Sequence, residues 1–264
     1  MKYIILILLF LTEFKQAESA IDKPLTKAVQ NEHRSIENKK RDKFRNPTET
    51  LNFFGINKNM KVLEIIPGRG WYTEIISSVM KGTNNFYVAT YKKPSYAKEI
   101  ITKIQKDFFI YFENNKDKFG EIKSVLINED FQIISEDNYF DMILTFRNTH
   151  NFLDQKKSDE IFNSIYRSLK KGGILGIVQH RANESSEFKY NKGYVKESFL
   201  INYLESLGFK LLEKSEINAN LKDLKNYEKG VWALPPRLTN GEKDRNFYQS
   251  IGESDRMTLK FVKK

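Results

Sequence analysis

The stretch Val62-Leu-Glu-Ile-Ile-Pro-Gly-Arg-Gly-Trp-Tyr-Thr-Glu74 decides the fold. It begins as a short apolar run of the kind that forms a strand buried on both faces. A glycine turn ends the run, and Ile75, Ile76, Val79 and Met80 then recur at helical spacing. Strand, glycine turn and helix can admit a ligand to the backbone, because glycine has no side chain and a helix N-terminus has free N–H donors. An ordinary strand-to-helix turn would show the same pattern.

Apolar segments and helical patterns alternate along the rest of the chain. Strands are predicted over 85–91, 123–127, 140–146, 174–178, 210–217 and 257–262, and helices over 24–54, 95–120, 159–169 and 195–207. In the second helix the expected buried stripe is Ile100, Ile101, Ile104, Phe108 and Phe109, and Lys170-Lys-Gly-Gly173 is expected to cap the third. This alternation is typical of an α/β domain with a mainly parallel sheet.

Composition narrows the classes of function. The 264 residues are enough for one α/β domain, and the absence of cysteine excludes disulfides, thiolate zinc sites and cysteine nucleophiles. His33, His150 and His180 are the only histidines, which argues against a histidine-rich metal site, so no metal is predicted. The net charge of +10 comes from lysines spread along the whole chain, so nucleic acid is not an expected partner.

The first residues have the features of a secretory signal peptide over 1–20. Lys2 is followed by a short apolar core over 3–11 and by small residues at 17–20. The prediction is an exported, periplasmic protein with no stable membrane span in the mature chain. An uncleaved N-terminus or a buried first helix, with a cytoplasmic location, is the alternative. A charged helical extension over 21–47 follows, and it is either a solvated face or a lid over the site.

Polar residues cluster where two predicted strands end. Arg147 and His150 follow the strand at 140–146, and His180 and Arg181 follow the strand at 174–178. Ligands of open parallel sheets bind at the carboxyl ends of the strands, so these side chains are predicted to face one crevice. His150 could be a general base or orient a substrate, or it could be a structural histidine bonded to a loop.

The motifs together resemble the class I S-adenosylmethionine (SAM)-dependent methyltransferases. The similarity rests on the glycine stretch, Phe140-Asp141 at a strand start, the Leu169-Lys-Lys-Gly-Gly-Ile-Leu175 turn, Phe146–Asn151 and Gly230–Pro236. The chain looks like a bacterial subgroup of methyltransferases predicted from sequence, whose members often begin with a signal peptide. The resemblance implies a Rossmann-like, doubly wound seven-stranded sheet of order 3-2-1-4-5-7-6 over 48–264, with an insertion over 218–255 before the last strand.

The resemblance also implies residues that bind SAM. Glu64 takes the acidic position that ends the first strand, and Gly68 and Gly70 take the last two glycines of the family's loop. Two positions depart from the family: Ile66 replaces the first glycine, and no acid ends the second strand. Tyr91 or Thr90 could bind the ribose hydroxyls instead.

Further residues of the implied site lie later in the chain. Asp130 or its neighbour Glu129 could lie near the adenine amino group. His150, Arg147 and His180 are the candidate catalytic residues on the acceptor side. Trp232 and Arg256 are candidates from the insertion and its end.

Three functions are compatible with the sequence. The first is methyl transfer from SAM to an unidentified small-molecule acceptor, and Arg147 and Arg181 would suit an anionic one. The second is an exported, non-catalytic ligand-binding protein on a methyltransferase fold, in keeping with the two departures from the family. The third is a serine hydrolase. It rests only on the short motifs Ser78-Val-Met-Lys81 and Ser186-Glu-Phe-Lys189, and matches of this length are expected by chance.

Overall fold

A computed structural model describes residues 23–91, 99–187 and 189–264. The predicted signal peptide over 1–20 lies outside these residues. Within them, no helix combines the length and the apolar character needed to cross a bilayer.

The described residues form a mixed sheet in the order β3-β2-β1-β4-β5-β7-β6, which confirms the predicted topology. The strands are β1 (Val62–Ile65), β2 (Phe86–Tyr91), β3 (Lys123–Ile127), β4 (Phe140–Phe146), β5 (Leu169–His180), β6 (Phe209–Ser215) and β7 (Arg256–Lys263). Strands β1 to β5 pair in parallel, whereas β7 runs antiparallel between β5 and β6. All four residues of β1 are buried, as expected for a central parallel strand covered on both faces.

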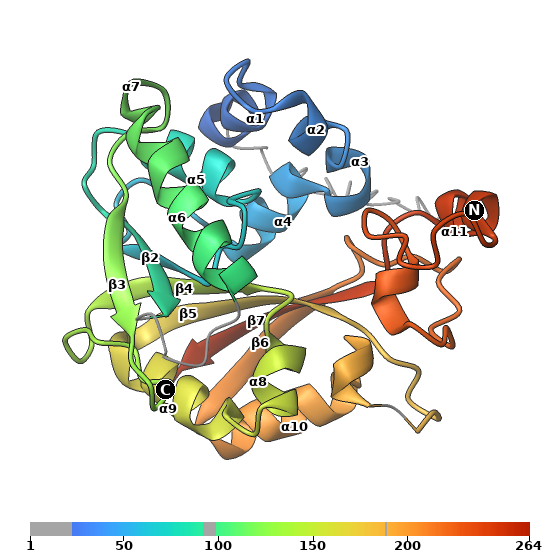
Figure 1. Cartoon of the computed structure of the whole chain (residues 1–264). Helices are drawn as coiled ribbons and strands as arrows, with labels where there is room; N and C mark the ends of the chain where they lie inside the picture. Colours follow the sequence, from blue (N-terminus) through green and yellow to red (C-terminus); the bar gives the residue numbers. More distant parts are fainter. Residues whose placement is uncertain (1–22, 92–98, 188) are drawn as a thin grey trace, which may run out of the picture.

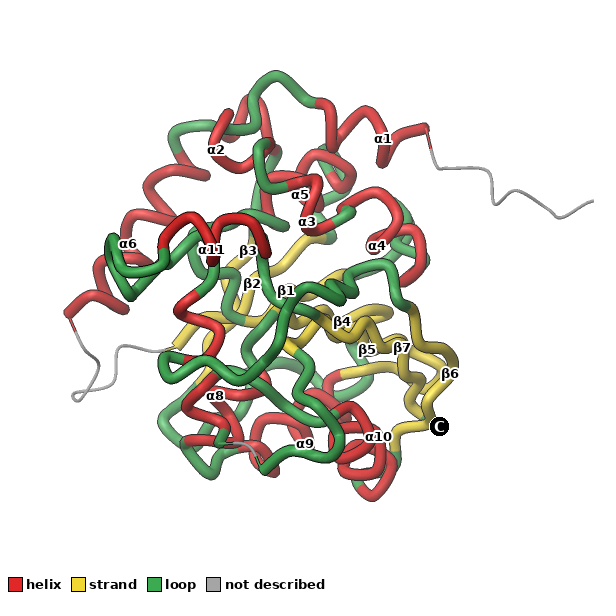
Figure 2. Tube along the Cα trace, turned by 90° about the vertical axis from the view of Figure 1, so that its right-hand side faces the viewer, coloured by secondary structure: helices red, strands yellow, loops and turns green. Residues whose placement is uncertain are grey.

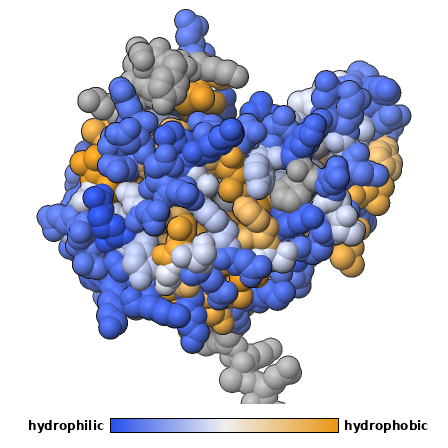
Figure 3. All heavy atoms as spheres, turned by 90° about the horizontal axis from the view of Figure 1, so that it is seen from below, coloured by the Kyte–Doolittle hydropathy of each residue, from blue (hydrophilic) through white to orange (hydrophobic). Residues whose placement is uncertain are grey.

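Helices cover both faces of the sheet (Figure 1). One layer holds α1 (Lys23–Gln30), α4 (Pro47–Phe54), α5 (Thr73–Met80), α6 (Glu99–Glu113) and α7 (Lys116–Phe119), and the other holds α8 (Thr149–Asp154), α9 (Ser158–Ser168) and α10 (Glu197–Ser206). Each layer closes its own apolar core against the sheet. On the side of α8, α9 and α10, the outer surface is mainly hydrophilic with small apolar areas (Figure 3).

The predicted N-terminal extension folds as α1, α2 (Ile36–Lys39) and α3 (Asp42–Arg45). Arg34 joins these helices, because its guanidinium donates to both carboxylate oxygens of Asp42 at 2.7 and 2.8 Å. The predicted insertion before the last strand is also ordered, and it holds the short helices η2 (Gly230–Ala233) and α11 (Arg245–Ile251). In Figure 2, α11 lies on the side of the molecule that faces the viewer, in front of the sheet.

The predicted glycine cap before the fifth strand is wrong. Strand β5 begins at Leu169, directly after α9, and Leu169 pairs with Phe140. The register then shifts, and regular pairing resumes between Ile174 and Met142. Gly172 lies in this irregular stretch with φ +76°. The glycines therefore allow an irregularity within the strand and do not end a helix.

The predicted buried stripe of the helix at 95–120 is partly wrong. Phe108 is buried, but Ile100 and Ile101 are 54% and 45% exposed. Both lie in the first turn of α6, beyond the edge of the apolar core, where they border cavities at the ends of the strands. The apolar residues at helical spacing therefore extend beyond the part of α6 that packs against the core.

Candidate functional site

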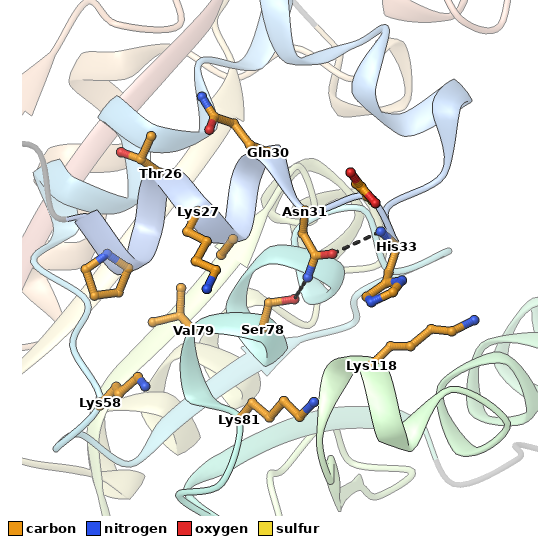
Figure 4. A pocket seen from close by; sticks show the side chains of 13 residues that line it. Thr26, Lys27, Gln30, Asn31, His33, Lys58, Ser78, Val79, Lys81 and Lys118 are labelled. Atoms are coloured by element: carbon orange, nitrogen blue, oxygen red, sulfur yellow. Dashed lines mark hydrogen bonds between the residues drawn. The ribbon is translucent and has the colours of Figure 1, made fainter.

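Two large cavities lie at opposite ends of the sheet. The first, of about 1070 Å³, lies between α1, α5 and α7, and Figure 4 shows Lys27, Lys58, Lys81 and Lys118 around it. Its Lys58, Lys81 and Lys118 precede β1, β2 and β3, so it borders the amino ends of these strands. Ligands of open α/β sheets bind at the opposite edge, so this cavity is not the expected active site.

The second cavity, of about 550 Å³, lies at the carboxyl ends of β1, β4 and β5. It is lined by the glycine loop, the first turn of α6, the residues after β4 and β5, and parts of the N-terminal extension and the insertion. The lining includes Asn38, Arg41, Ile66, Gly68, Arg147, His150, His180, Trp232, Arg237, Glu253 and Ser254. The three predicted catalytic residues therefore meet in one cavity beside the predicted SAM loop.

The two glycines of the loop have different surroundings. Gly68 has φ +62°, and a Cβ there would meet no atom within 4 Å. Gly70 has φ +82°, and a Cβ there would lie 2.6 Å from a ring atom of Phe112. Gly68 thus leaves open backbone at the cavity, whereas Gly70 allows α6 to pack closely on the loop.

Ile66 stands where the family has its first glycine, and it adopts the backbone conformation of a glycine. Its φ is +47°, which is a strained value for a β-branched residue. Asn148 holds this conformation, because its side-chain amide donates to the carbonyl oxygens of Ile65 and Ile66 at 2.9 and 3.3 Å. The loop therefore keeps the shape of a glycine-rich turn despite the substitution.

A small recess of about 50 Å³ adjoins the cavity at the end of β2, and Ile66 and Gly68 line both spaces. Its walls include Tyr91 and the apolar side chains of Ile101 and Ile104, which suit the flat face of a base. Gln105, which sequence reasoning missed, also lines it and donates to Thr90 Oγ1 at 3.1 Å and to the Tyr91 carbonyl at 3.0 Å. No motif singles out Gln105, because its position depends on how α6 packs.

Glu64 lies behind the loop and lines neither the cavity nor the recess. Its side chain is buried and accepts a hydrogen bond from Thr73 Oγ1 at 2.7 Å. Burial raises the pKa of Glu64 to about 8, and the bond from Thr73 only partly opposes this effect.

This pKa predicts a stability that falls with pH. Between the unfolded value near 4.5 and the folded value near 8, only the unfolded state releases the Glu64 proton, so we expect the group to cost the fold about 2 kcal/mol between pH 5 and 7. Urea unfolding of the protein and of Glu64→Gln at both pH values measures this contribution as a difference. Equal pH dependence in the two proteins would contradict it. The comparison is needed because His150 and His180 contribute with the opposite sign.

His150 is neutral and has one free ring nitrogen. Its Nδ1 lies 3.2 Å from Gln179 Nε2, which also donates to the Gly193 carbonyl at 2.9 Å. Gln179 Oε1 lies 3.4 Å from the same Nδ1, so the shorter contact, with Gln179 Nε2, favours Nδ1 as an acceptor. His150 Nε2 is buried and has no partner among the described residues. Burial lowers the pKa of His150 to about 4, and the nearby charge of Arg147 adds to the effect.

His180 and Trp232 complete one wall of the cavity. His180 Nδ1 lies 2.5 Å from Ser254 Oγ, and burial together with His150 and Arg147 holds the pKa of His180 well below its usual range. The Trp232 ring centroid lies 5.6 Å from that of His150 and 6.4 Å from that of His180. This wall can pack against a planar ligand.

A cluster of four arginines surrounds one carboxylate beside the cavity. Glu253 accepts from Arg41 Nε at 2.7 Å, Arg45 Nε at 3.0 Å and Arg256 Nη1 at 3.2 Å, and Arg147 lies nearby. Burial alone would raise the pKa of Glu253, but the arginines lower it to about 2. Arg41 Nη2 and both terminal nitrogens of Arg45 are buried without a partner in the described chain. We call Arg41, Arg45, Arg147, Arg256 and Glu253 the arginine cluster. It places four guanidinium groups around one carboxylate.

Arg147 is the member of the cluster with the most freedom to bind a ligand. It lines the cavity, it is half-buried, and the described residues offer its guanidinium no hydrogen-bond partner. Burial lowers its pKa to about 10, against the opposing effect of Glu253, so it remains a cation at neutral pH. Arg256 belongs to the cluster but does not line the cavity.

The expectation that Arg181 faces the same crevice is wrong. Its guanidinium is bound to Asp255, Glu197 and Glu216 at 3.0, 3.1 and 2.6 Å. Arg181 lines neither the cavity nor the recess, because the carboxylates around the end of β5 draw it away.

Asp130 lies on an exposed turn after β3 and lines neither the cavity nor the recess. Its backbone N–H is held by Asn128 Oδ1 at 3.0 Å. A role near an adenine group stays a prediction for this residue. In the part of the chain that the structure describes, no three His, Asp or Glu side chains gather in a way that could hold a metal ion.

The N-terminal extension forms part of the cavity rim, as the lid hypothesis requires. The indole of Trp71, which follows the glycine loop, donates to the Asn38 carbonyl at 2.9 Å, and the Asn38 side chain donates to Glu74 at 3.0 Å. The guanidinium of Arg45 lies 4.6 Å from the Trp71 ring centroid. Sequence reasoning missed Asn38, Arg41 and Glu253, because only the fold brings these distant positions together.

The comparisons with known proteins bear on the fold. No protein-family model and no curated protein matches the sequence. Among solved structures, the chain is similar to a SAM-dependent methyltransferase from Aquifex aeolicus, at 18% identity and a TM-score of 0.53, over 67% of this chain and 87% of that one. It is also similar to the [4+2]-cyclase SpnF, at 12% identity and a TM-score of 0.59, over 91% of each chain.

A third similar structure comes from Galdieria sulphuraria and is provisionally described as a sarcosine dimethylglycine methyltransferase. It has 13% identity and a TM-score of 0.55, over 92% of this chain and 91% of that one. Such low identities speak for the architecture alone. Together with the strand order and the glycine loop, they show that this chain has the fold of the class I SAM-dependent methyltransferases.

Proposed function

We propose that the protein binds SAM at the glycine loop and transfers its methyl group to a small-molecule acceptor in the adjoining cavity. The observation that carries this proposal is the open backbone at Gly68, which lines both the cavity and the apolar recess at the end of β2. The similar structures described as methyltransferases support it at the level of the fold.

The described residues offer places for the adenosine part and for the methionine part of SAM. The recess offers Ile101 and Ile104 for the adenine. Tyr91 ends β2, the strand that ends in the ribose acid in the family, and Gln105 of α6 lies beside it. Gly68 would let the methionine part lie on the backbone, and Glu64, which keeps its proton at neutral pH, would support the loop from behind through its bond with Thr73. SAM supplies an electrophilic methyl group when bound, and the protein's main task is to align the acceptor with it.

Calorimetric titration of SAM and of S-adenosylhomocysteine tests the proposal. We expect binding of both by the chain that starts near Ile21, and a loss of about tenfold or more in affinity in Gly68→Leu, because the leucine side chain would enter open space that the ligand needs. Ile66→Gly is the matched variant, and it should bind at least as tightly, because glycine takes φ +47° without strain. A folded sample that gives no heat at several temperatures would contradict SAM binding and favour the non-catalytic alternative.

We also propose that residues 1–20 direct export. The charged start, the short apolar core and the small residues before position 21 support this role. Determination of the N-terminal residue of the protein produced in a bacterial host checks it, and a chain that retains Met1 would contradict cleavage.

A further inference from the structure

One carboxylate lines the cavity, and no strongly basic side chain there is free to accept a proton. Of the titratable side chains that line it, Arg41, Arg69, Arg147 and Arg237 are cations, and Glu253 is the single carboxylate. The Glu253 carboxylate is ionised, but its oxygens already accept hydrogen bonds from three arginines. The remaining candidates for a general base are His150 and His180.

Both histidines are weak bases, because burial and the charge of Arg147 disfavour their protonated forms. Gln179 holds His150 Nδ1, with the shorter contact from its amide nitrogen, and with that tautomer Nε2–H is a donor without a partner among the described residues. His180 is tied to Ser254 and lies with His150 beside Arg147, whose charge disfavours a second cation. The cavity thus offers positive charge, but its two candidate proton acceptors are weak bases.

A methyl acceptor whose nucleophilic atom has no proton to lose needs no base in this cavity, and an anion suits the positive charge. We infer that the acceptor is a small carboxylic acid and that its carboxylate oxygen receives the methyl group. This inference rests on the proposed methyl transfer. The planar carboxylate matches the fork of the Arg147 guanidinium, and His150 Nε2–H can donate to it. The wall formed by Trp232 and the histidines suits an apolar or aromatic remainder.

The step balances without any proton transfer. The carboxylate oxygen attacks the methyl carbon, the new O–CH₃ bond forms as the S–CH₃ bond breaks, and the bonding pair stays on sulfur. The products are a neutral methyl ester and S-adenosylhomocysteine. Since the ester no longer carries the charge that Arg147 holds, it binds more weakly than the acid and can leave.

The binding experiment uses phenylacetate and hexanoate as probes, titrated into the protein saturated with S-adenosylhomocysteine. We expect both acids to bind, and Arg147→Met to lose affinity by about tenfold or more, because a charge-assisted bond is removed. Arg147→Lys should keep part of the affinity. Arg245→Met is the matched charge control, since Arg245 lies on α11 and does not line the cavity. Equal affinity in all three variants would overturn the role of Arg147.

The chemical experiment uses SAM with a tritiated methyl group and a panel of phenylacetate, hexanoate, benzyl alcohol, phenol, benzylamine and phenyl phosphate. We expect label that mild base releases as volatile methanol, from the acids alone, and a kcat/KM that stays level between pH 6 and 8, because carboxylates are ionised throughout. A base-stable product, a rate that rises with pH, or no product from either acid while SAM binds would overturn the inference and leave the proposed function standing. Failure to bind SAM or S-adenosylhomocysteine would instead count against the proposed function.

Discussion

Glu253→Gln is expected to lower the free energy of unfolding by about 3–5 kcal/mol at pH 7. The substitution removes the one carboxylate that balances Arg41, Arg45 and Arg256, and leaves buried guanidinium groups to repel one another. Glutamine keeps the shape and one acceptor oxygen, so a large loss would reflect charge rather than volume. Urea unfolding of both proteins measures the effect.

The pH dependence provides a second test of the same residue. Because the arginines lower the pKa of Glu253 from 4.5 to about 2, its stabilising effect is present above pH 4.5 and is lost as the pH falls toward 2. The difference between the two proteins should therefore shrink over this range. Arg147→Met is the contrasting variant: it removes an unmatched charge, so the unliganded protein should keep or gain stability. A loss in Arg147→Met as large as that in Glu253→Gln would contradict the excess of positive charge.

Gly70→Ala is expected to destabilise the protein by about 2–5 kcal/mol. The new methyl group would lie 2.6 Å from a ring atom of Phe112 and 3.1 Å from one of Phe108, and the residue must hold φ +82°. Backbone strain of about 1–2 kcal/mol and overpacking of about 1–3 kcal/mol both contribute. Chemical denaturation followed by circular dichroism measures the loss.

Gly68→Ala separates the two causes. Gly68 has a similar φ of +62°, but a methyl group there meets nothing within 4 Å, so only the strain of about 1–2 kcal/mol should remain. The difference between the two variants then reports the contact with α6. Equal losses would mean that the Phe108 and Phe112 rings move aside at little cost.

The sequence predicts the elements of this fold well where local pattern and buried environment agree. The apolar run of β1, its glycine turn and the helix after it lie where the pattern places them, and the strand order follows the family resemblance. The pattern fails at Ile100 and Ile101, because a helical period cannot show where the core ends. It also fails at Leu169, where a strand begins at the residue that was predicted to end a helix.

The site was predictable only in part. His150, His180 and Arg147 follow strands whose ends meet, so their convergence follows from topology. Arg181 directly follows His180, so the same argument predicts that it faces the cavity. Its side chain instead binds three carboxylates, and no local sequence pattern connects them to it. The arginine cluster joins positions more than 200 residues apart, which only the folded chain brings together.

The bond between Arg41 and Glu253 orders the events of biosynthesis. The two residues are 212 positions apart, so Arg41 and Arg45 cannot bind Glu253 until the ribosome has made all of the intervening chain. Until then the two guanidinium groups lack the carboxylate that they share in the folded protein. The part of the cavity rim that depends on this cluster is therefore completed only when almost the whole chain has been made.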